Sequence, residues 1–205
     1  MTSKLRLYGF KLSGHTHRAE LFLSILGLPF EKIEVDVLKG AHKQPEFLAM
    51  NPLGQVPVLQ DGDWTIADSN AILVYLALEY DTSRQWYPLD ARRAARVQRW
   101  LSIAAGELRE GPGAARLVRL LGAKLDHERA KSIAATLYGV VDRELASTPY
   151  LACATPTIAD LALYSYTAVA TEGDVSLEPW PNVRAWLARI ESIERFVAMP
   201  QSSSA

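Results

Sequence analysis

The stretch NPLGQVPVLQDGDWTIADSNAI, residues 51–72, contains a short apolar strand that starts next to a proline and turns back at an Asp-Gly pair. Pro57 has no N–H to give to a sheet ladder, so it belongs at the first residue of a strand or on an edge, where neighbouring backbone stays free to bind a ligand. Asp-Gly is a strong hairpin signal, here between strands expected over residues 56–59 and 64–66. The stretch therefore predicts an antiparallel hairpin beside a section of unpaired backbone.

A helix is expected after this hairpin, opening with Asp68 and Ser69 and continuing as an apolar run through Leu78. Both residues are good N-caps, so a purely structural cap explains them. The positive end of a helix also binds anions, so the alternative is that both residues bind a ligand.

Length and charge limit the classes of function that the chain can have. The 205 residues, 49% of them hydrophobic, can build one large domain or two small ones. A net charge of −1, from 22 basic and 23 acidic residues, gives no reason to expect nucleic acid or an anionic membrane as partner. No segment has the pattern of a signal peptide or a membrane span, so we expect a cytoplasmic protein. The single cysteine, Cys153, excludes an internal disulfide and a cysteine-based metal cluster.

The first eighty residues alternate between strand and helix patterns. A strand is expected over residues 4–8, a helix over 16–26, a second strand over 29–36 and a short helix or turn over 43–50. A strand, helix, strand beginning implies a right-handed parallel crossover, and the later hairpin adds antiparallel strands. The sequence therefore predicts a small α/β layer with a mixed sheet.

The second half is expected to be helical throughout. After the polar stretch 81–88, apolar residues recur at helical spacing and no strand-like alternation returns. The expected helices cover residues 90–110, which GPG at 111–113 breaks or kinks, then 133–145, 158–170 and 183–196.

Two features of this helical half suit structural roles. Thr157 and Asp160 have the spacing of a capping box, with Asp where Glu or Gln is usual. Between Asp90 and Lys131 there are ten basic and five acidic residues. A solvated basic face explains this excess better than an anion-binding patch, because such side chains mostly lie outside.

Three motifs in this order resemble a known family. They are LYGFKLSGHTHRAELFLSILGLPFE at residues 7–31, HKQPEFLAMNPLGQVPVLQDGD at 42–63 and IADSNAILVYLA at 66–77. With the helical second half, they resemble the cytosolic glutathione transferases over essentially the whole chain, closest to the serine-type phi class and related bacterial enzymes. The resemblance implies an α/β plus all-α fold: a thioredoxin-like N-terminal domain over residues 1–80, a linker over 81–89 and a helical-bundle C-terminal domain over 90–205.

The resemblance also implies that glutathione is the co-substrate, bound where the two domains meet. Pro57 would be cis, and the Val56 backbone would pair with the cysteinyl part of glutathione like an added strand. Ser69 and the amides of its helix would receive the γ-glutamyl carboxylate, while Asp68 pairs with the α-ammonium group.

The other end of glutathione would meet a second group of residues. By the same resemblance, His42 and Lys43 would bind the glycyl carboxylate and Gln55 the tripeptide backbone. Taken alone, Lys43 is a typical solvated lysine and His42 a typical loop histidine. Their placement relative to Gln55 is what favours the binding role.

Ser13, in the loop after the first strand, is the expected catalytic residue. A free thiol has a pKa of about 8.5, so an enzyme that uses glutathione must stabilise the thiolate at neutral pH. Ser13 would do so by donating a hydrogen bond to sulfur, aided by the N-terminal end of the following helix. Tyr8, the group used in other classes, is expected to pack on the first strand instead.

His15 departs from the family pattern, where related sequences often have Asn or a small residue. It is a candidate catalytic assistant that adds positive charge in mildly acid solution, but a structural role is favoured. His15 and His17 make a poor metal site because no third ligand accompanies them, so no metal is expected.

The second substrate would be a small hydrophobic electrophile. Phe10, Lys11 and Leu12 would face its pocket, and the helices over residues 90–110 and 157–170 would form the other wall. The thiolate would displace a halide or add to a polarised double bond. A homodimer is implied, with basic residues near 92–99 at the interface.

Two alternatives remain at the level of sequence. One is a glutathione-dependent dehalogenase or isomerase, although the isomerases of the zeta class have Ser-Ser-Cys where this loop has Ser-Gly-His. The other is a non-catalytic module that binds protein partners with the same fold. Such modules tend to lose the glutathione-binding residues, which are all present here.

Overall fold

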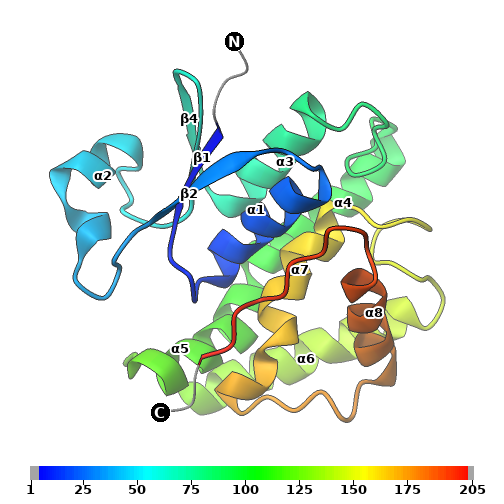
Figure 1. Cartoon of the computed structure of the whole chain (residues 1–205). Coiled ribbons are helices and arrows are strands. Elements are labelled where there is room, and N and C mark those ends of the chain that lie inside the picture. The colour runs from blue at the N-terminus through cyan, green and yellow to red at the C-terminus, as the bar shows by residue number, and fades with distance from the viewer. Residues whose placement is uncertain (1–4, 203–205) are drawn as a thin grey trace.

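The structure, a computed structural model, describes residues 5–202 and divides into an α/β layer and a set of helices (Figure 1). The layer consists of β1 (Leu5–Gly9), α1 (Gly14–Ile25), β2 (Phe30–Glu34), the 3-10 turn η1 (Ala41–Lys43), α2 (Pro45–Met50), β3 (Val58–Asp61), β4 (Trp64–Ala67) and α3 (Ser69–Glu79). The helical part consists of α4 (Ala91–Ala105), the π-helical turn η2 (Arg109–Gly113), α5 (Ala114–Leu121), α6 (His127–Leu145), α7 (Ile158–Ala168), the 3-10 turn η3 (Ala170–Gly173) and α8 (Pro181–Glu191). The expected thioredoxin-like and helical parts are both confirmed.

The sheet has the strand order β2-β1-β3-β4. β1 and β2 are parallel, while β3 is antiparallel to both β1 and β4, which confirms the mixed sheet. The first strand was expected to begin at Lys4, which lies outside the described residues. β3 begins at Val58, two residues later than expected, after the cis peptide bond between Val56 and Pro57. Pro57 cannot donate to the ladder, so strand pairing starts beyond it.

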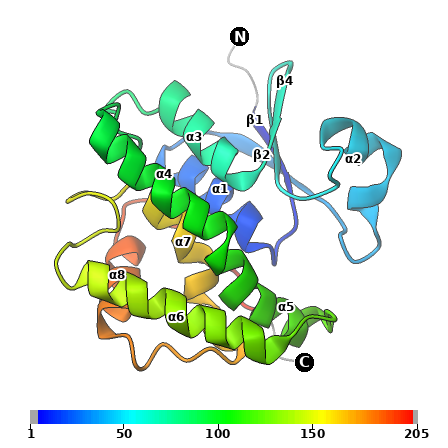
Figure 2. The same ribbon diagram turned by 180° about the vertical axis from the view of Figure 1, so that it is seen from behind.

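The two faces of the sheet are covered differently. Helices α1 and α3 lie on one face, and α2 lies on the other (Figures 1 and 2). On the α2 side, Val35, Phe47 and Val58 form a small apolar cluster. On the other side the buried residues form a single cluster that continues from α1 and α3 into the helical part, where Trp100 and Trp186 are its largest side chains. The two parts of the chain therefore share a core.

The helical part differs from expectation at its turns. The first helix ends at Ala105, and the Gly-Pro-Gly residues lie in the π-helical turn η2, from which α5 continues directly. Helix α5 was missed, because a break or kink was expected at Gly-Pro-Gly and no helix was expected directly after it. Helix α6 begins six residues earlier than expected, since Asp126 caps it by accepting from the Arg129 N–H. Helix α8 ends five residues earlier, at Glu191.

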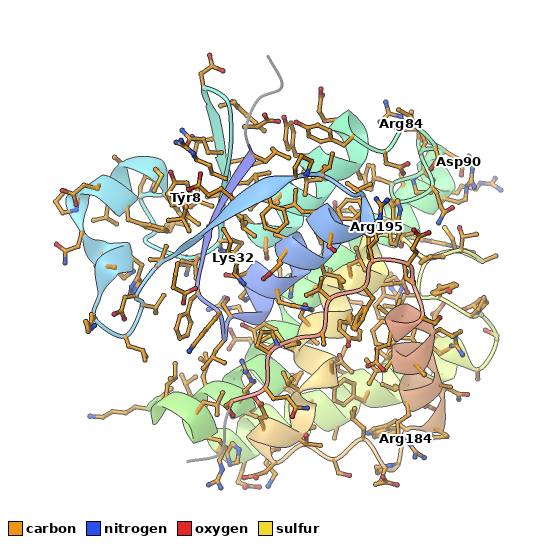
Figure 3. All side chains as sticks on the ribbon, in the orientation of Figure 1. Tyr8, Lys32, Arg84, Asp90, Arg184 and Arg195 are labelled. Carbon is orange, nitrogen blue, oxygen red and sulfur yellow. The ribbon has the colours of Figure 1, made fainter. Side chains whose placement is uncertain are left out.

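The chain after α8 runs back across α1 and α7, where Figure 1 shows it in red. Ser24 Oγ donates to the Arg195 carbonyl at 2.7 Å, and the His17 ring is 2.8 Å from the Val197 carbonyl oxygen. Figure 3 shows the labelled Arg195 beside α1. This segment ends against the helical part, where the Ser202 N–H donates to Glu172. Within residues 5–202, no helix is long and apolar enough to cross a membrane.

Helix α7 is the central helix, because every residue from Ile158 to Thr167 is buried. The expected capping box is present at its start. Asp160 accepts from the Thr157 N–H at 2.9 Å and from the Thr157 hydroxyl, and also from the Leu151 N–H at 3.0 Å and Trp186 Nε1 at 2.9 Å. Burial raises the pKa of Asp160, and these hydrogen bonds oppose that rise. One carboxylate therefore joins α7 to α8 and to the segment before α7.

Replacing Asp160 is expected to destabilise the whole fold. Asp160→Ala leaves three buried N–H donors without a partner, so we expect a loss of about 3–4 kcal/mol in the free energy of unfolding. Asp126→Ala is the matched control, because it removes an exposed cap of α6 and should cost only about 1 kcal/mol. Urea unfolding of both variants measures the difference, and equal losses would contradict the central role of Asp160.

Candidate active site

Ser13 is the N-cap of α1, and its main chain and side chain are both tethered. Its hydroxyl oxygen accepts from the Thr16 N–H at 3.2 Å. Its N–H donates to the Phe10 carbonyl and its carbonyl accepts from the His17 N–H, both at 2.9 Å. Helix α1 thus begins at Gly14, two residues before the expected start. Ser13 is partly exposed, and the tethers leave its hydroxyl proton available to a ligand.

The turn that carries Ser13 is held close to the sheet. The Thr16 hydroxyl oxygen accepts from the Phe10 N–H at 3.2 Å. A Cβ at Gly9 would lie 2.1 Å from Thr16 Cγ2, so only glycine allows this approach at the end of β1. The buried Thr16 therefore sets the distance between β1 and the Ser13 turn.

The helical part holds the same turn from the other side. Arg116 of α5 is buried, donates to the Leu12 carbonyl at 2.6 Å and pairs with Glu172 at 2.5 Å. Tyr166 of α7 packs against Gly14, where an added Cβ would be 2.9 Å from the ring. Sequence reasoning missed both residues. It counted Arg116 within a solvated basic face and named α7 only as a pocket wall.

The start of α3 lies beside the Ser13 turn. Asp68 has a φ of 75°, an uncommon conformation for a residue other than glycine. Its Oδ1 accepts from the Asn70 and Ala71 N–H groups, both at 2.9 Å, so Oδ1 is the oxygen that caps the helix. Ser69 is buried, and its hydroxyl oxygen is 3.1 Å from Nδ1 of His15. His15 thus connects the first turn of α1 to the first turn of α3.

His15 does not supply positive charge, which corrects one of the two roles considered for it. Burial lowers its pKa to about 3, with further lowering by the charges of Arg18 and Arg109. At neutral pH the imidazole is therefore uncharged. Its hydrogen bond to Ser69 and its edge-to-face contact with Tyr166, at 5.2 Å between ring centroids, support the structural role.

The buried positive charge of the site belongs to Arg18 instead, a residue that sequence reasoning did not consider. Burial lowers its pKa to about 10, so the guanidinium remains protonated at neutral pH. Its Nη1 donates to Asn70 Oδ1 at 2.7 Å, while its Nε and Nη2 have no hydrogen-bond partner within residues 5–202. An arginine within a helix that is buried on most sides carries no local signal in the sequence.

The residues expected at the glycyl end of glutathione lie in and near η1. Lys43 Nζ donates to the carbonyls of Leu53 and Gly54 at 3.1 and 2.9 Å. Nδ1 of His42 is buried without a hydrogen-bond partner in the described part of the chain. Gln55 is exposed, and Val56 makes no main-chain hydrogen bond within residues 5–202.

The three residues expected to face the electrophile differ in exposure. Phe10 is buried, Leu12 is half-buried and Lys11 is exposed. Tyr8 packs on the sheet as expected, and its hydroxyl donates to Gln60 at 3.3 Å (Figure 3). No group of three or more His, Cys, Asp or Glu side chains among residues 5–202 is arranged to hold a metal ion.

Known proteins share this fold and this order of motifs. The model for the glutathione S-transferase N-terminal domain matches residues 3–78, and the model for the C-terminal domain matches residues 126–189. Human glutathione S-transferase theta-2 is 34% identical over 198 residues, covering 92% of this chain and 81% of the human protein. Glutathione S-transferase 3 of Zea mays is 34% identical over 222 residues, covering 98% of this chain and 99% of the Zea mays protein.

Solved structures agree with these relatives. A glutathione S-transferase from Pseudomonas fluorescens superposes with a TM-score of 0.91 at 33% identity, covering 97% of this chain and 100% of that one. A glutathione transferase homologue from Drosophila mojavensis, with bound glutathione, has a TM-score of 0.85 at 28% identity and covers 94% and 89%. The chain belongs to the glutathione S-transferase family.

The neutral, partly buried His15 predicts a pH dependence of stability. Its pKa is about 3 in the folded protein and 6.5 when unperturbed, so below pH 6.5 the unfolded chain binds a proton that the folded chain excludes. Stability is therefore complete above pH 6.5 and falls as the pH drops toward 3. When the pH falls from about 7 to about 5, we expect the free energy of unfolding to decrease by about 1–2 kcal/mol less in the His15→Asn variant than in the unmodified chain.

Urea unfolding at both pH values measures this difference. His127→Asn, at a histidine outside the site that contacts the Gly173 carbonyl, is the control. Parallel loss of stability in the His15→Asn variant and the unmodified chain would contradict a neutral His15.

Proposed function

We propose that this chain is a glutathione transferase of the alkyl or aryl transfer type, which joins the thiolate of glutathione to a hydrophobic electrophile. The observation that carries the proposal is the position of Ser13. Its oxygen accepts from the first turn of α1, a turn that His15 connects to the start of α3, and its proton is available to a ligand. We further propose residues 1–80 as the glutathione-binding domain, 81–89 as a linker and 90–205 as the helical domain.

Ser13 supports this chemistry as a hydrogen-bond donor. A thiol with a pKa of about 8.5 is mostly protonated at neutral pH, and a donor fixed in place stabilises the anion more than mobile water does. The N-terminal end of α1 adds a positive dipole end at the same point. In this proposal Ser13 holds the thiolate and forms no covalent bond itself.

The start of α3 suits the γ-glutamyl end of glutathione. Ser69 and the first amides of the helix would bind the carboxylate, with the protonated Arg18 behind them. Both cap hydrogen bonds of Asp68 go to Oδ1, so Oδ2 would be the oxygen that meets the α-ammonium group.

The glycyl end would lie over η1. The unpaired Val56 backbone would hydrogen-bond the cysteinyl part, and Gln55 would reach the tripeptide backbone. His42 supports a ligand role because its buried Nδ1 lacks a partner among the described residues. Lys43 would give up one of its two hydrogen bonds to loop carbonyls and pair with the glycyl carboxylate instead.

The electrophile would enter beside Lys11 and Leu12, which are accessible, while the buried Phe10 would form the floor of the pocket. Attack by sulfur displaces a halide or adds to a polarised double bond, so the protein contributes binding and a prepared nucleophile. Because of its Ser13 loop, we place the enzyme near the phi class. Because its single cysteine, Cys153, is unpaired, we propose that the protein is cytoplasmic.

We also propose a homodimer formed around a groove between α3 and α4. The groove has a volume of about 520 Å³ and includes Val74, Tyr75 and Leu101. The α4 arginines over residues 92–99 are exposed. A second copy of the chain would cover this apolar surface, with the α/β part of one chain on the helices of the other.

Ser13→Ala tests the catalytic proposal. Loss of the donor should shift the thiolate band of bound glutathione, followed by ultraviolet difference spectra across pH, to higher pH. It should also lower kcat/KM with chlorodinitrobenzene about 100-fold. Ser24→Ala removes another α1 hydroxyl, one that donates to the Arg195 carbonyl, and should change neither value. A thiolate band that survives in the Ser13→Ala variant would assign the role to the helix end, and absence of glutathione binding would favour a partner-binding module.

Val74→Arg tests the dimer. A charge in the groove should convert the dimer to a monomer in sedimentation velocity, because a buried unpaired cation is strongly unfavourable. Val140→Arg on α6, at an exposed position, should leave the dimer intact. A monomeric unmodified chain would contradict the proposed interface.

A further inference from the structure

Arg116 of α5 bonds the catalytic turn one residue before Ser13. We propose that Arg116 and Glu172 are positioning residues, which fix the peptide between Leu12 and Ser13 so that the Ser13 hydroxyl faces the glutathione sulfur. The C-terminal segment, residues 192–202, completes the arrangement by holding Glu172. This inference rests on the proposed glutathione transferase function, and it adds a pair of residues that lie outside the proposed ligand-binding groups.

The peptide unit between Leu12 and Ser13 is bonded at both of its ends. Its N–H, from Ser13, donates to the Phe10 carbonyl at 2.9 Å. Its C=O, from Leu12, accepts from Arg116 Nη1 at 2.6 Å. Rotation of this unit would change ψ of Leu12 and φ of Ser13, and would cost both hydrogen bonds. The two bonds therefore fix the direction in which the Ser13 side chain leaves the main chain.

The peptide before it is held by the sheet. The Lys11 N–H donates to Oε1 of Glu34, the last residue of β2, at 3.1 Å. Without Arg116, water would replace the donor at the Leu12 carbonyl, and a mobile donor leaves the next peptide free to turn. Misplacing a catalytic group by about 1 Å can cost an enzyme about 100-fold in rate, so a small reorientation of Ser13 has a measurable effect.

Arg116 is itself held by an ion pair with Glu172 of η3. Its side chain is 3% exposed, and its Nε donates to Glu172 Oε2 at 2.5 Å. Its Nη2 has no partner within residues 5–202, so Nε and Nη1 carry its hydrogen bonds. Separating the pair would leave a buried charge without its partner. Because the two charges offset each other, the pair acts on Ser13 through the position of the peptide rather than through its charge.

The C-terminal segment takes the second oxygen of the same carboxylate. The Ser202 N–H donates to Glu172 Oε1 at 2.8 Å, while Oε2 belongs to Arg116. With both oxygens bonded, the carboxylate has one orientation. From Ser202 to the Leu12 carbonyl, every step is a hydrogen bond made by Glu172 or Arg116. The end of the described chain is therefore connected to the catalytic turn.

The double variant Arg116→Met with Glu172→Gln tests the proposal, because it removes both charges together and leaves the Leu12 carbonyl without its donor. The ultraviolet band of bound glutathione should titrate about 0.5–1 pH unit higher, and kcat/KM with chlorodinitrobenzene near neutral pH should fall about three- to tenfold. The KM for glutathione should stay within about twofold, because no group proposed to bind glutathione is changed.

The matched control is Arg119→Met with Asp174→Asn. It removes a second ion pair, 3.0 Å long, that joins α5 to the residue after η3. Asp174 has a φ of 60°, which Asn adopts readily. The control should leave both values unchanged. An equal shift in the control would mean that looser packing of α5 moves the titration, and would overturn the proposal.

Ser202→Pro tests the C-terminal link in a protein that keeps its ion pair and its fold. Proline removes the N–H that Glu172 accepts, so the band should move in the same direction by about 0.2–0.5 pH unit. Gln201→Pro is the control, because the Gln201 N–H makes no hydrogen bond within residues 5–202. A Ser202→Pro variant that titrates like the Gln201→Pro variant would overturn the role of the C-terminal segment.

The double variant in the Ser13→Ala background separates positioning of Ser13 from any other effect on sulfur. With the Ser13 hydroxyl absent, the added shift should be less than about 0.2 pH unit. A shift of equal size in both backgrounds would overturn the proposal. So would a double variant that titrates like the unmodified chain while Ser13→Ala does not, which would leave the transferase function intact. If the unmodified chain shows no thiolate band, the proposed function fails and this inference fails with it.

Discussion

Burial of α7 on nearly all sides is the constraint on which the rest of the structure depends. An apolar helix of this kind is stable only when other elements surround it, and α1, α3, α4 and α8 all pack against it. Asp160 fixes its first turn through hydrogen bonds that are all buried. The position of α7 then determines how the helical part meets the α/β layer: the Ser165 hydroxyl lies 2.9 Å from the His17 ring of α1, and the Tyr166 ring packs against Gly14.

The candidate site is made where two helix N-termini meet over this shared core. Helix α1 presents Ser13 and helix α3 presents Asp68 and Ser69, with His15 joining the two first turns. Two helix ends that point positive charge toward one place suit a thiolate and a carboxylate of the same ligand. The uncharged His15 connects the two helix starts, and the buried Arg18 supplies the positive charge behind them. Because Arg116 and Tyr166 come from the helical part, loss of packing there would loosen the catalytic turn as well.

Much of the fold was predictable because its signals are local. The Asp-Gly hairpin, the capping box of Thr157 and the loop position of Ser13 each depend on a few neighbouring residues, and the structure has all three. Errors arose where the same residue types have two uses. The Gly-Pro-Gly stretch at 111–113 was expected to break or kink a helix, but no helix was expected directly after it; its small residues let α6 and Tyr166 pack against a π-helical turn.

By itself, the sequence determined the order of strands and helices, the separation into a mixed sheet and a helical half, and the set of residues to examine for glutathione binding. Periodicity, turn residues and caps carry that information along the chain. Only the tertiary structure decided that Arg18 and Arg116 are buried cations, that His15 is neutral, and that Tyr166 packs against Gly14. These properties arise from desolvation and from contacts between residues more than a hundred positions apart, which no local pattern encodes.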